Sequence, residues 1–309
     1  MSRRVLVLAH TGRPAVVATA QEVVRLLAAS GLHPVLLADE ATDLPGCTGV
    51  ERVAPEAVGG LELVLVLGGD GTVLRGAELV HGTEVPLLGV DLGHVGFLAD
   101  TEPEALEATV QHVAQRTYAV EERLTLAVDV HHGGALLASA WALNEVSVEK
   151  GAREQLLEVV TEVDGRPVST FGGDGVVMAT PTGSTAYAFS AGGPVVWPGV
   201  AALVMVPIAA HTLFARPLVV SPEAVLAVEV LERNRTDGVL WCDGRRSLPL
   251  PPGARVEVRR GPSPVRLART APGPFTDRLV AKFGLAVGGW RGPDTPSAAP
   301  DRPPLPGGS

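Results

Sequence analysis

Apolar runs and helix-like segments alternate over the first third of the chain. Four runs rich in Val and Leu have the continuous apolar character of strands that are buried on both faces of a parallel sheet. They lie at residues 4–9, 35–38, 61–67 and 86–90. Between the first two, apolar residues recur at helical spacing from Ala15 to Ala29, with Pro14 suited to the first turn and Gly31 to the C-terminal cap. This alternation predicts a right-handed, mostly parallel α/β sheet.

The same pattern continues to about residue 120. We expect a helix from the end of the third run to about Val80, and Thr101 and Glu104 form a capping box for a helix that ends near Arg116. Residues 45–60 are rich in turn-forming residues, which indicates a surface loop. The pattern therefore predicts an α/β domain over residues 1–120.

After Tyr118 the pattern changes to the two-residue period of half-buried strands. Apolar residues alternate with others from Leu124 to Val130, and Gly133-Gly134 and Asp164-Gly165 are hairpin signals. Further short strands are expected at residues 225–231, 239–242 and 256–258. The pattern predicts a second, mainly antiparallel all-β domain over residues 121–270.

The C-terminal end has two parts. Residues 275–283 have the pattern of a helix, with apolar Leu279, Val280 and Phe283. Such a helix must bury its apolar face, so we expect residues 271–290 to pack back on the α/β domain. Residues 291–309 are rich in Pro, Gly and Ser with few apolar side chains, which is typical of a disordered tail.

Composition narrows the class of protein. The 309 residues are 46% hydrophobic and 19% charged, as in globular proteins that are large enough for two domains. A net charge of −9 argues against nucleic acid as the main partner, and no apolar stretch reaches the length of a membrane span. Cys47 and Cys242 have neither metal-ligand nor disulfide-framework spacing. We expect a cytoplasmic protein without a metal site of its own.

The first candidate for chemistry is the turn that follows the third apolar run, Gly68-Gly69-Asp70-Gly71-Thr72. Glycines let the backbone turn sharply and approach a ligand, and N–H groups at a helix N-terminus bind phosphate. A carboxylate would repel phosphate, so we expect Asp70 to handle a proton, a hydroxyl or a metal there; the alternative is a simple helix cap. Parallel strands share their carboxyl edge, which predicts that this turn lies next to residues 91–97.

The second domain carries further candidates. Asn144 and Glu145 end an apolar segment and suit ribose hydroxyls or an adenine edge, although Asn in a simple turn explains them equally well. The loop from Asp174 to Pro194 is dense in hydroxyl groups around Tyr187, which suits a polyhydroxylated, phosphorylated ligand. His211 lies in an apolar setting, where a hydrogen-bonded structural histidine is the more common finding.

Together these stretches resemble the NAD kinases. The resemblance covers residues 4–282 and rests on four motifs in the family's order and spacing. They are Gly68 to Thr72, Asn144-Glu145, Asp174 through Thr180-Pro181-Thr182-Gly183-Ser184-Thr185-Ala186-Tyr187, and Ala210 to Pro217. The glycine motif also occurs in phosphofructokinases and lipid kinases, whereas the motif that ends at Tyr187 is far more specific.

The resemblance implies transfer of the γ-phosphoryl group of ATP, with Mg²⁺, to the adenosine 2′-hydroxyl of NAD, which gives NADP. It implies a homodimer or homotetramer, with the active site in the cleft between the two domains. By position, Asp70 is implied as the general base for the 2′-hydroxyl. The implied nucleotide-binding residues are Asp70, Gly71, Arg75, Asn144, Glu145, Asp174, Thr185, Ala186, Tyr187, Ala188, Phe189, Ser190, Ala209 and His211.

Three positions differ from the family pattern. Gly172 stands where many members carry an arginine, so that phosphate contact is missing or comes from another residue such as Arg153 or Arg166. Asp91 replaces a usual asparagine, and Arg245 a frequent glutamine. Two alternative functions stay open: a lipid or sugar kinase with the same glycine turn, and a non-catalytic sensor of NAD or NADP.

Overall fold

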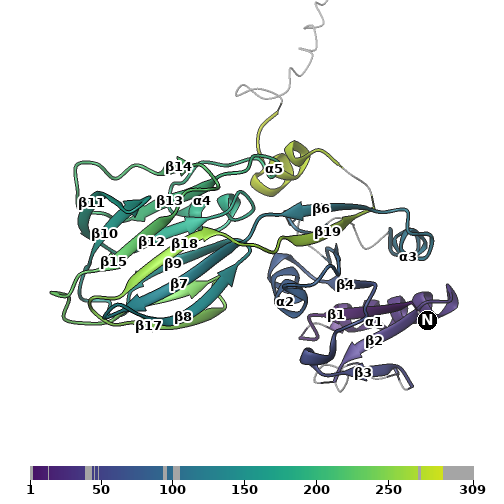
Figure 1. Ribbon diagram of the computed structural model, residues 1–309. Coiled ribbons are helices and arrows are strands. Elements are labelled where there is room, and N and C mark those ends of the chain that lie inside the picture. Colours follow the sequence, from purple (N-terminus) through teal and green to yellow (C-terminus); the bar gives the residue numbers. More distant parts are fainter. Residues whose placement is uncertain are drawn as a thin grey trace, which may run out of the picture.

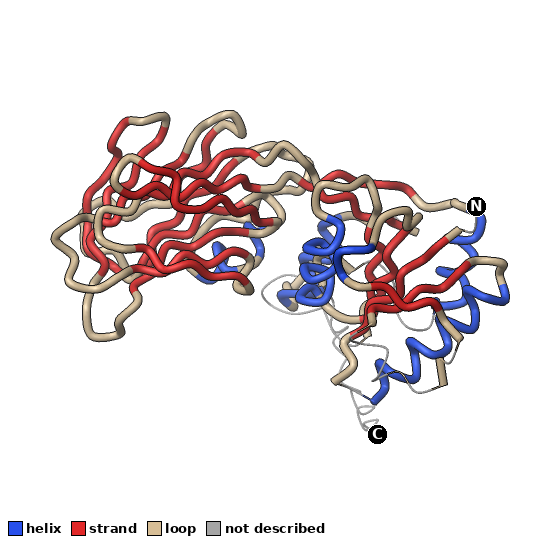
Figure 2. Tube along the Cα trace, turned by 60° about the horizontal axis from the view of Figure 1, so that its bottom comes forward, coloured by secondary structure: helices blue, strands red, loops and turns tan. Residues whose placement is uncertain are grey.

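Two domains of different architecture lie side by side in the computed structural model (Figure 1). One contains all the longer helices but the last, and the other is built from strands (Figure 2). The structure describes residues 3–12, 14–38, 44, 46–47, 49–92, 96–99, 105–270 and 273–287. No helix among these residues is both long enough and apolar enough to cross a membrane.

The first domain is a seven-stranded sheet in the order β3-β2-β1-β4-β5-β19-β6. Its strands are β1 (Arg4–Ala9), β2 (His33–Leu37), β3 (Glu51–Val53), β4 (Leu63–Leu67), β5 (Leu87–Val90), β6 (Ala119–Arg123) and β19 (Val265–Arg269). All neighbours pair in parallel except β19 and β6, which are antiparallel. The mostly parallel α/β sheet predicted from the sequence is confirmed.

Helices cover both faces of this sheet. On one face, α1 (Pro14–Ala29) and α3 (Leu106–Gln115) bury apolar residues against β1 and β4. On the other face, α2 (Asp70–Val80) packs Val73, Leu74 and Ala77 on the same strands. That second core also contains Leu143 from the β domain, so α2 lies on the side that faces the second domain.

The second domain is a sandwich of two six-stranded antiparallel sheets. The first, β11-β10-β15-β18-β7-β8, contains β7 (Leu126–His132), β8 (Ala135–Ala142), β10 (Leu157–Val163), β11 (Arg166–Gly173), β15 (Leu226–Val230) and β18 (Arg255–Arg260). The second, β14-β13-β12-β9-β16-β17, contains β9 (Glu145–Lys150), β12 (Gly175–Ala179), β13 (Leu203–Ile208), β14 (Leu218–Val220), β16 (Gly238–Cys242) and β17 (Arg246–Leu250). A core of Val, Leu and Met side chains lies between the sheets, as period-2 patterning requires.

Both hairpin signals mark hairpins. Gly133 and Gly134 join β7 to β8, and Asp164 and Gly165 join β10 to β11. All four residues have positive φ, between 52° and 80°, which is the conformation that two-residue turns between twisted strands require. The sequence therefore placed these two turns correctly.

The division of the chain differs from the expected boundaries. Residues 119–123 and 265–269 form β6 and β19, so the chain re-enters the first sheet at the end of the stretch assigned to the β domain. The stretch 45–60, expected to be a loop, contains β3 and the 3₁₀ turn η2 (Pro55–Ala57). Three-residue strands carry too few positions for a period to appear, and β3 forms by pairing in parallel with β2.

The final helix, α5 (Phe275–Phe283), contacts both domains. Its Phe275 and Phe283 lie 5.5 and 5.9 Å from Phe97 of the first domain, measured between ring centroids. Phe283 also lies 4.5 Å from Phe189, and Phe275 lies 5.0 Å from Trp197. The helix thus reaches the α/β domain as expected, and it also covers part of the β domain. The capping box at Thr101–Glu104 and the tail 291–309 fall outside the described residues.

Candidate active site

The glycine turn joins β4 to α2 at the carboxyl edge of the first sheet. Gly68 has a φ of 148°, and a Cβ there would lie 2.5 Å from Thr72 Oγ1, so the position requires glycine. The helix begins at Asp70, and its N-cap residue, Gly69, makes no side-chain capping bond. The N-terminus of α2 therefore opens at the sheet edge without a capping side chain, an arrangement that favours anions.

The Asp70 carboxylate contacts the segment that follows β5. Its Oδ2 accepts the N–H of Phe97 at 3.2 Å, and its Oδ1 accepts the N–H of Leu98 at 3.0 Å. A Cβ on Gly96 would lie 2.5 Å from Oδ1, so glycine there permits the close approach. Each carboxylate oxygen has two lone pairs, which leaves acceptor capacity for a ligand. The alternative role of Asp70 as a helix cap is wrong, and the expected neighbourhood of the two turns is confirmed.

A cavity of about 400 Å³, the glycine-turn cavity, opens at this turn. Its lining residues are His10, Val16, Gly68, Gly69, Gly71, Thr72, Arg75, Asp91, Leu92 and Arg245. Of these described residues, only Arg245 comes from the β domain. Two arginines, a helix N-terminus and open glycine backbone give the cavity what a chain of phosphates needs.

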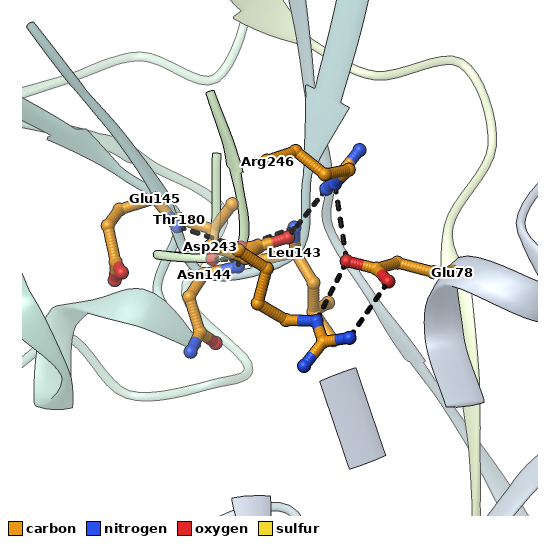
Figure 3. A network of polar contacts seen from close by, with 8 residues as sticks. Glu78, Leu143, Asn144, Glu145, Thr180, Asp243 and Arg246 are labelled. Atoms are coloured by element: carbon orange, nitrogen blue, oxygen red, sulfur yellow. Dashed lines mark hydrogen bonds and ion pairs between the residues drawn. The ribbon is translucent and has the colours of Figure 1, made fainter. Parts of the chain in front are cut away.

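A second turn, Leu143 to Glu145, joins β8 to β9 in the β domain. The carboxylate of Asp243 accepts three consecutive backbone N–H groups of this turn: Leu143 at 3.0 and 3.1 Å, Asn144 at 2.7 Å and Glu145 at 3.3 Å. Arg246 Nη2 donates to the same carboxylate at 3.1 Å. The side chains of Asn144 and Glu145 extend away from Arg246 (Figure 3). One buried carboxylate thus fixes the backbone that presents both candidate side chains.

The loop after β12 packs behind this second turn. The Thr180 hydroxyl donates to the carbonyl of Leu143 at 2.7 Å, and the Thr180 N–H donates to the carbonyl of Asn144 at 2.9 Å. Gly183 lies so close that a Cβ would meet the Asn144 carbonyl oxygen at 2.0 Å. Ser184 donates to the carbonyl of Pro181 at 2.7 Å, and both Thr180 and Ser184 are fully buried. These two hydroxyls of the hydroxyl-rich loop hold the backbone of the turn and the loop.

Glu145 and Asn144 are buried with unused polar atoms. Burial raises the pKa of Glu145 to about 8, and the negative charge of Asp243 adds to the shift, while the Tyr187 N–H opposes it. Glu145 Oε2 and Asn144 Oδ1 accept no hydrogen bond from any described residue. Buried oxygens without donors are costly in an empty protein, so this pair is suited to a ligand that supplies N–H or O–H groups.

A second cavity of about 390 Å³, the Tyr187 cavity, opens at Glu145. Its lining residues are Glu145, Ser147, Glu149, Tyr187, Trp241 and Gly244. Burial raises the pKa of Tyr187, and the charges of Glu149, Asp174 and Glu145 raise it further, so the phenol stays protonated and can donate. Aromatic rings with acidic and hydroxyl groups between them suit a nucleoside, which offers flat bases and sugar hydroxyls.

One hairpin contributes to the lining of both cavities. Gly244 lines the Tyr187 cavity and the next residue, Arg245, lines the glycine-turn cavity, so their Cα atoms are about 3.8 Å apart. Glu78 on α2 binds both arginines of this hairpin: its Oε1 lies 3.0 Å from Arg245 Nε and 3.2 Å from Arg246 Nε. Figure 3 shows Glu78 and Asp243 on either side of Arg246. An ion-pair chain thus links α2 to the second turn.

The structure places several of the implied residues at these two cavities. Gly71 and Arg75 line the first and Asp70 lies in the same turn, while Glu145 and Tyr187 line the second. Asn144 adjoins Glu145. The negative charge of Asp174 contributes to the raised pKa of Tyr187, and Asp174 forms an ion pair with Lys150 at 2.6 Å.

The remaining implied residues lie elsewhere. Thr185, Ala186, Ala188, Phe189 and Ser190 belong to η4 (Gly183–Thr185), α4 (Tyr187–Ser190) and their junction. Ala188 is fully buried, and the Phe189 ring packs on α5. Ala209 has a φ of 46°, and His211 bridges to Gly172 at a separate pocket with Arg233 and Arg235. His211 is not among the described residues that line the glycine-turn cavity or the Tyr187 cavity. Neither Arg153 nor Arg166 is among the described residues that line the two cavities.

Sequence reasoning missed the residues that join the two turns. Asp243 is not among the predicted site residues, although an Asp-Gly pair after an apolar strand is itself a hairpin signal. Asp243 and Gly244 have φ of 53° and 61°, as that signal predicts. Nothing in the sequence connects this hairpin with Glu78, because 167 residues separate Glu78 from Arg245.

A phosphate-suited helix N-terminus that faces a nucleoside-suited β sandwich defines a nucleotide-binding protein of the phosphotransferase type. Residues 5–118 match the ATP-NAD kinase N-terminal domain and residues 143–270 match the ATP-NAD kinase C-terminal domain. The chain therefore belongs to the ATP-NAD kinase family.

Individual relatives agree over nearly the whole length. "NAD kinase 2" of Streptomyces coelicolor is 60% identical over 293 residues, 94% of this chain and 97% of that protein. The NAD kinase of Leifsonia xyli subsp. xyli is 60% identical over 297 residues, 94% and 98% of the two chains.

Solved structures share the fold. A yeast NADH kinase complexed with NADH has a TM-score of 0.85 at 22% identity, over 93% of this chain and 89% of that one. An NAD kinase from Archaeoglobus fulgidus in complex with ATP has a TM-score of 0.67 at 24% identity, over 92% and 98%.

Proposed function

We propose that this protein transfers the γ-phosphoryl group of ATP to the adenosine 2′-hydroxyl of NAD, which yields NADP. The observation that carries the proposal is that two consecutive residues of one hairpin, Gly244 and Arg245, line the two cavities. One cavity suits a phosphate chain and the other suits a nucleoside, so a phosphate donor and a hydroxyl acceptor can be aligned across the hairpin. Such alignment is the main contribution of a protein to phosphoryl transfer.

Asp70 is the proposed general base. It lies at the start of α2 between the phosphate-binding backbone and the segment 96–98, and its carboxylate keeps lone pairs for a ribose hydroxyl. A hydroxyl is a poor nucleophile at neutral pH, and a positioned carboxylate contributes about 10²–10⁴-fold.

The acceptor nucleotide is expected in the Tyr187 cavity. The unused oxygens of Asn144 and Glu145 would accept hydrogen bonds from ribose hydroxyls or from an adenine amino group. Asp174, the run Thr185 to Ser190, Ala209 and His211 complete the nucleotide-binding set in this proposal.

Mg²⁺ enters as part of the ATP substrate. Asp91 lines the glycine-turn cavity and offers the carboxylate oxygens that Mg²⁺ prefers. The ion would neutralise charge on the phosphates, while Arg75 and the N-terminus of α2 hold the phosphate chain.

We further infer a homodimer or homotetramer in the cytoplasm. The region around the β11 and β14 edges exposes apolar side chains that a second copy would cover: Leu156, Val168, Leu213, Phe214 and Val219. Light scattering coupled to gel filtration measures the assembly, and a monomer at micromolar concentration would contradict it.

The activity is tested by incubating the purified protein with NAD, ATP and Mg²⁺ and measuring NADP with a coupled dehydrogenase. NADP above a no-enzyme control is expected. Without NADP formation but with NAD binding intact, the non-catalytic sensor would replace the kinase. Phosphorylation of a lipid in place of NAD would point to the lipid kinase alternative.

A further inference from the structure

We propose that Arg245 is a phosphate-binding residue of the glycine-turn cavity, contributed by the β domain and positioned there by Glu78. The proposal rests on the proposed function, since it assigns a further residue to the donor side of the same reaction. It is independent of the assignment of Asp70, because binding of phosphate does not require a base.

The position of Arg245 sets it apart from the other cations near the cavities. Among the described residues that line the glycine-turn cavity, it is the only one carried by the β domain. Arg245 belongs to the hairpin of β16 and β17, and it lines the cavity together with Gly69, Gly71 and Arg75. A phosphate chain bound at the N-terminus of α2 would therefore meet one arginine from each domain.

The guanidinium of Arg245 keeps an edge for a ligand. Glu78 occupies its Nε, at 3.0 Å, and its Nη2, at 3.4 Å. The Nη1 edge makes no hydrogen bond or ion pair with the described part of the chain. Because a guanidinium is planar and has five N–H donors, pairing on one edge fixes the direction of the other. Glu78 thus fixes the plane of the guanidinium of Arg245, a residue that lines the cavity.

Charge balance favours a phosphate partner. Glu78 is shared between Arg245 and Arg246, and Arg246 is also paired with Asp243. Asp91 contributes one negative charge to the cavity lining, against Arg75, Arg245 and the N-terminus of α2. Arg75, Arg245 and the N-terminus of α2 thus place positive charge at the cavity in a protein whose net charge is −9.

The same hairpin holds the acceptor side in place. Asp243, whose carboxylate fixes the Leu143–Glu145 turn, lies two residues before Arg245, and the Arg245 N–H donates to the carbonyl of Cys242 at 3.0 Å. Arg245 therefore belongs to a segment of fixed geometry, so little side-chain entropy is lost when it binds a phosphate.

The test measures binding of inorganic tripolyphosphate and of ATP by isothermal titration calorimetry. Arg245→Gln is expected to weaken both by about ten- to hundredfold, the range for a hydrogen bond to a charged group. In steady-state assays the same variant is expected to raise KM for ATP and to leave KM for NAD within about twofold. The phosphate affinity of Arg245→Lys should lie between those of the wild type and Arg245→Gln, because lysine keeps the positive charge but lacks the planar, bidentate donor geometry of a guanidinium.

Glu78→Gln separates phosphate binding from simple domain pairing. This variant keeps one acceptor oxygen that can still position Arg245, and it removes a negative charge near the cavity, so tripolyphosphate is expected to bind at least as tightly as to the wild type. If the ion pair served only to hold the domains together, both variants would weaken binding alike. Equal weakening would overturn the proposal.

The matched control is Arg259→Gln. Arg259 pairs with Asp129 at 2.6 Å on the other sheet, with similar exposure, and lines neither cavity. Its affinity for tripolyphosphate should equal that of the wild type. If the wild type binds tripolyphosphate and Arg245→Gln binds it equally well, the assignment of Arg245 is rejected and the proposed function is not. A wild type that binds neither ATP nor tripolyphosphate would reject the proposed function and this assignment together.

Discussion

The two turns that build the candidate site are assembled in different ways. The glycine turn is encoded in five consecutive residues, since β4, the positive φ of Gly68 and the start of α2 follow one another in the chain. The Leu143–Glu145 turn depends on Asp243, which is about 100 residues further along. The first turn is therefore a local property of the sequence, and the second exists only once the sandwich has formed.

This difference has a chemical consequence. The glycine turn offers backbone N–H groups and a surface carboxylate, which need little support. The second turn presents two buried polar side chains, and their positions need a rigid backbone because a small displacement would leave them unpaired. The chain supplies that rigidity with Asp243 on one side and the Thr180–Gly183 loop on the other.

The largest effect is expected at the local turn. Asp70→Asn should lower turnover by about 10²–10⁴-fold, because the amide cannot accept the 2′-hydroxyl proton. NAD affinity, measured by calorimetry, should stay near that of the wild type. Near-normal turnover would reject Asp70 as the base and leave it as a support for residues 97 and 98.

The pH dependence of stability tests the buried pair at the second turn. Because burial and Asp243 raise the pKa of Glu145 to about 8, the folded protein holds a proton that the unfolded chain releases near its ordinary pKa of 4.5. Stability from this group is therefore full below about pH 4.5 and is lost as pH rises toward 8, by a few kcal/mol. Urea unfolding between pH 5 and 8.5 should show this loss in the wild type and a flatter curve in Glu145→Gln. Parallel curves would show that Glu145 has no raised pKa.

Gly183→Ala breaks the loop support of the second turn. The new Cβ would overlap the Asn144 carbonyl oxygen, so the backbone must shift, at a cost of about 2–3 kcal/mol in stability. NAD affinity should fall with it. Gly199→Ala is the control, since no atom lies within 4 Å of a Cβ there, and it should leave both measurements unchanged. Equal stability of the two variants would contradict the close packing.

Asp243→Asn removes charge while keeping size and tolerance of positive φ. The loss of charged hydrogen bonds to three N–H groups should cost about 2 kcal/mol and weaken NAD binding more than ATP binding. Asp164→Asn is a matched control, because Asp164 also starts an Asp-Gly hairpin but accepts a single N–H, from Val225 at 2.9 Å, at the surface. Its cost should stay below about 0.5 kcal/mol. Equal costs would show that Asp243 does not support the turn.

Local patterns predicted much of the fold. Continuous apolar runs identified β1, β4 and β5, and Gly-Gly and Asp-Gly pairs identified two hairpins. The sequence pattern did not predict that β19 returns to the first sheet, because a five-residue strand has the same alternation whichever sheet it joins. It did not predict β3 either, because three residues are too few to show a hydrophobic period. At the site, the sequence identified Asn144 and Glu145 as candidate residues. It did not identify the Asp243 carboxylate that holds their backbone in place.

The sequence by itself determined the glycine turn, the alternation of the first domain and the period-2 strands of the second, because each depends on neighbouring residues. Only the tertiary structure decided which groups meet. It brought Asp243 under the Leu143–Glu145 turn, placed Gly244 and Arg245 at different cavities, and paired Glu78 with a hairpin 167 residues away. Such contacts follow from how two separately built cores pack, and no short-range pattern records that.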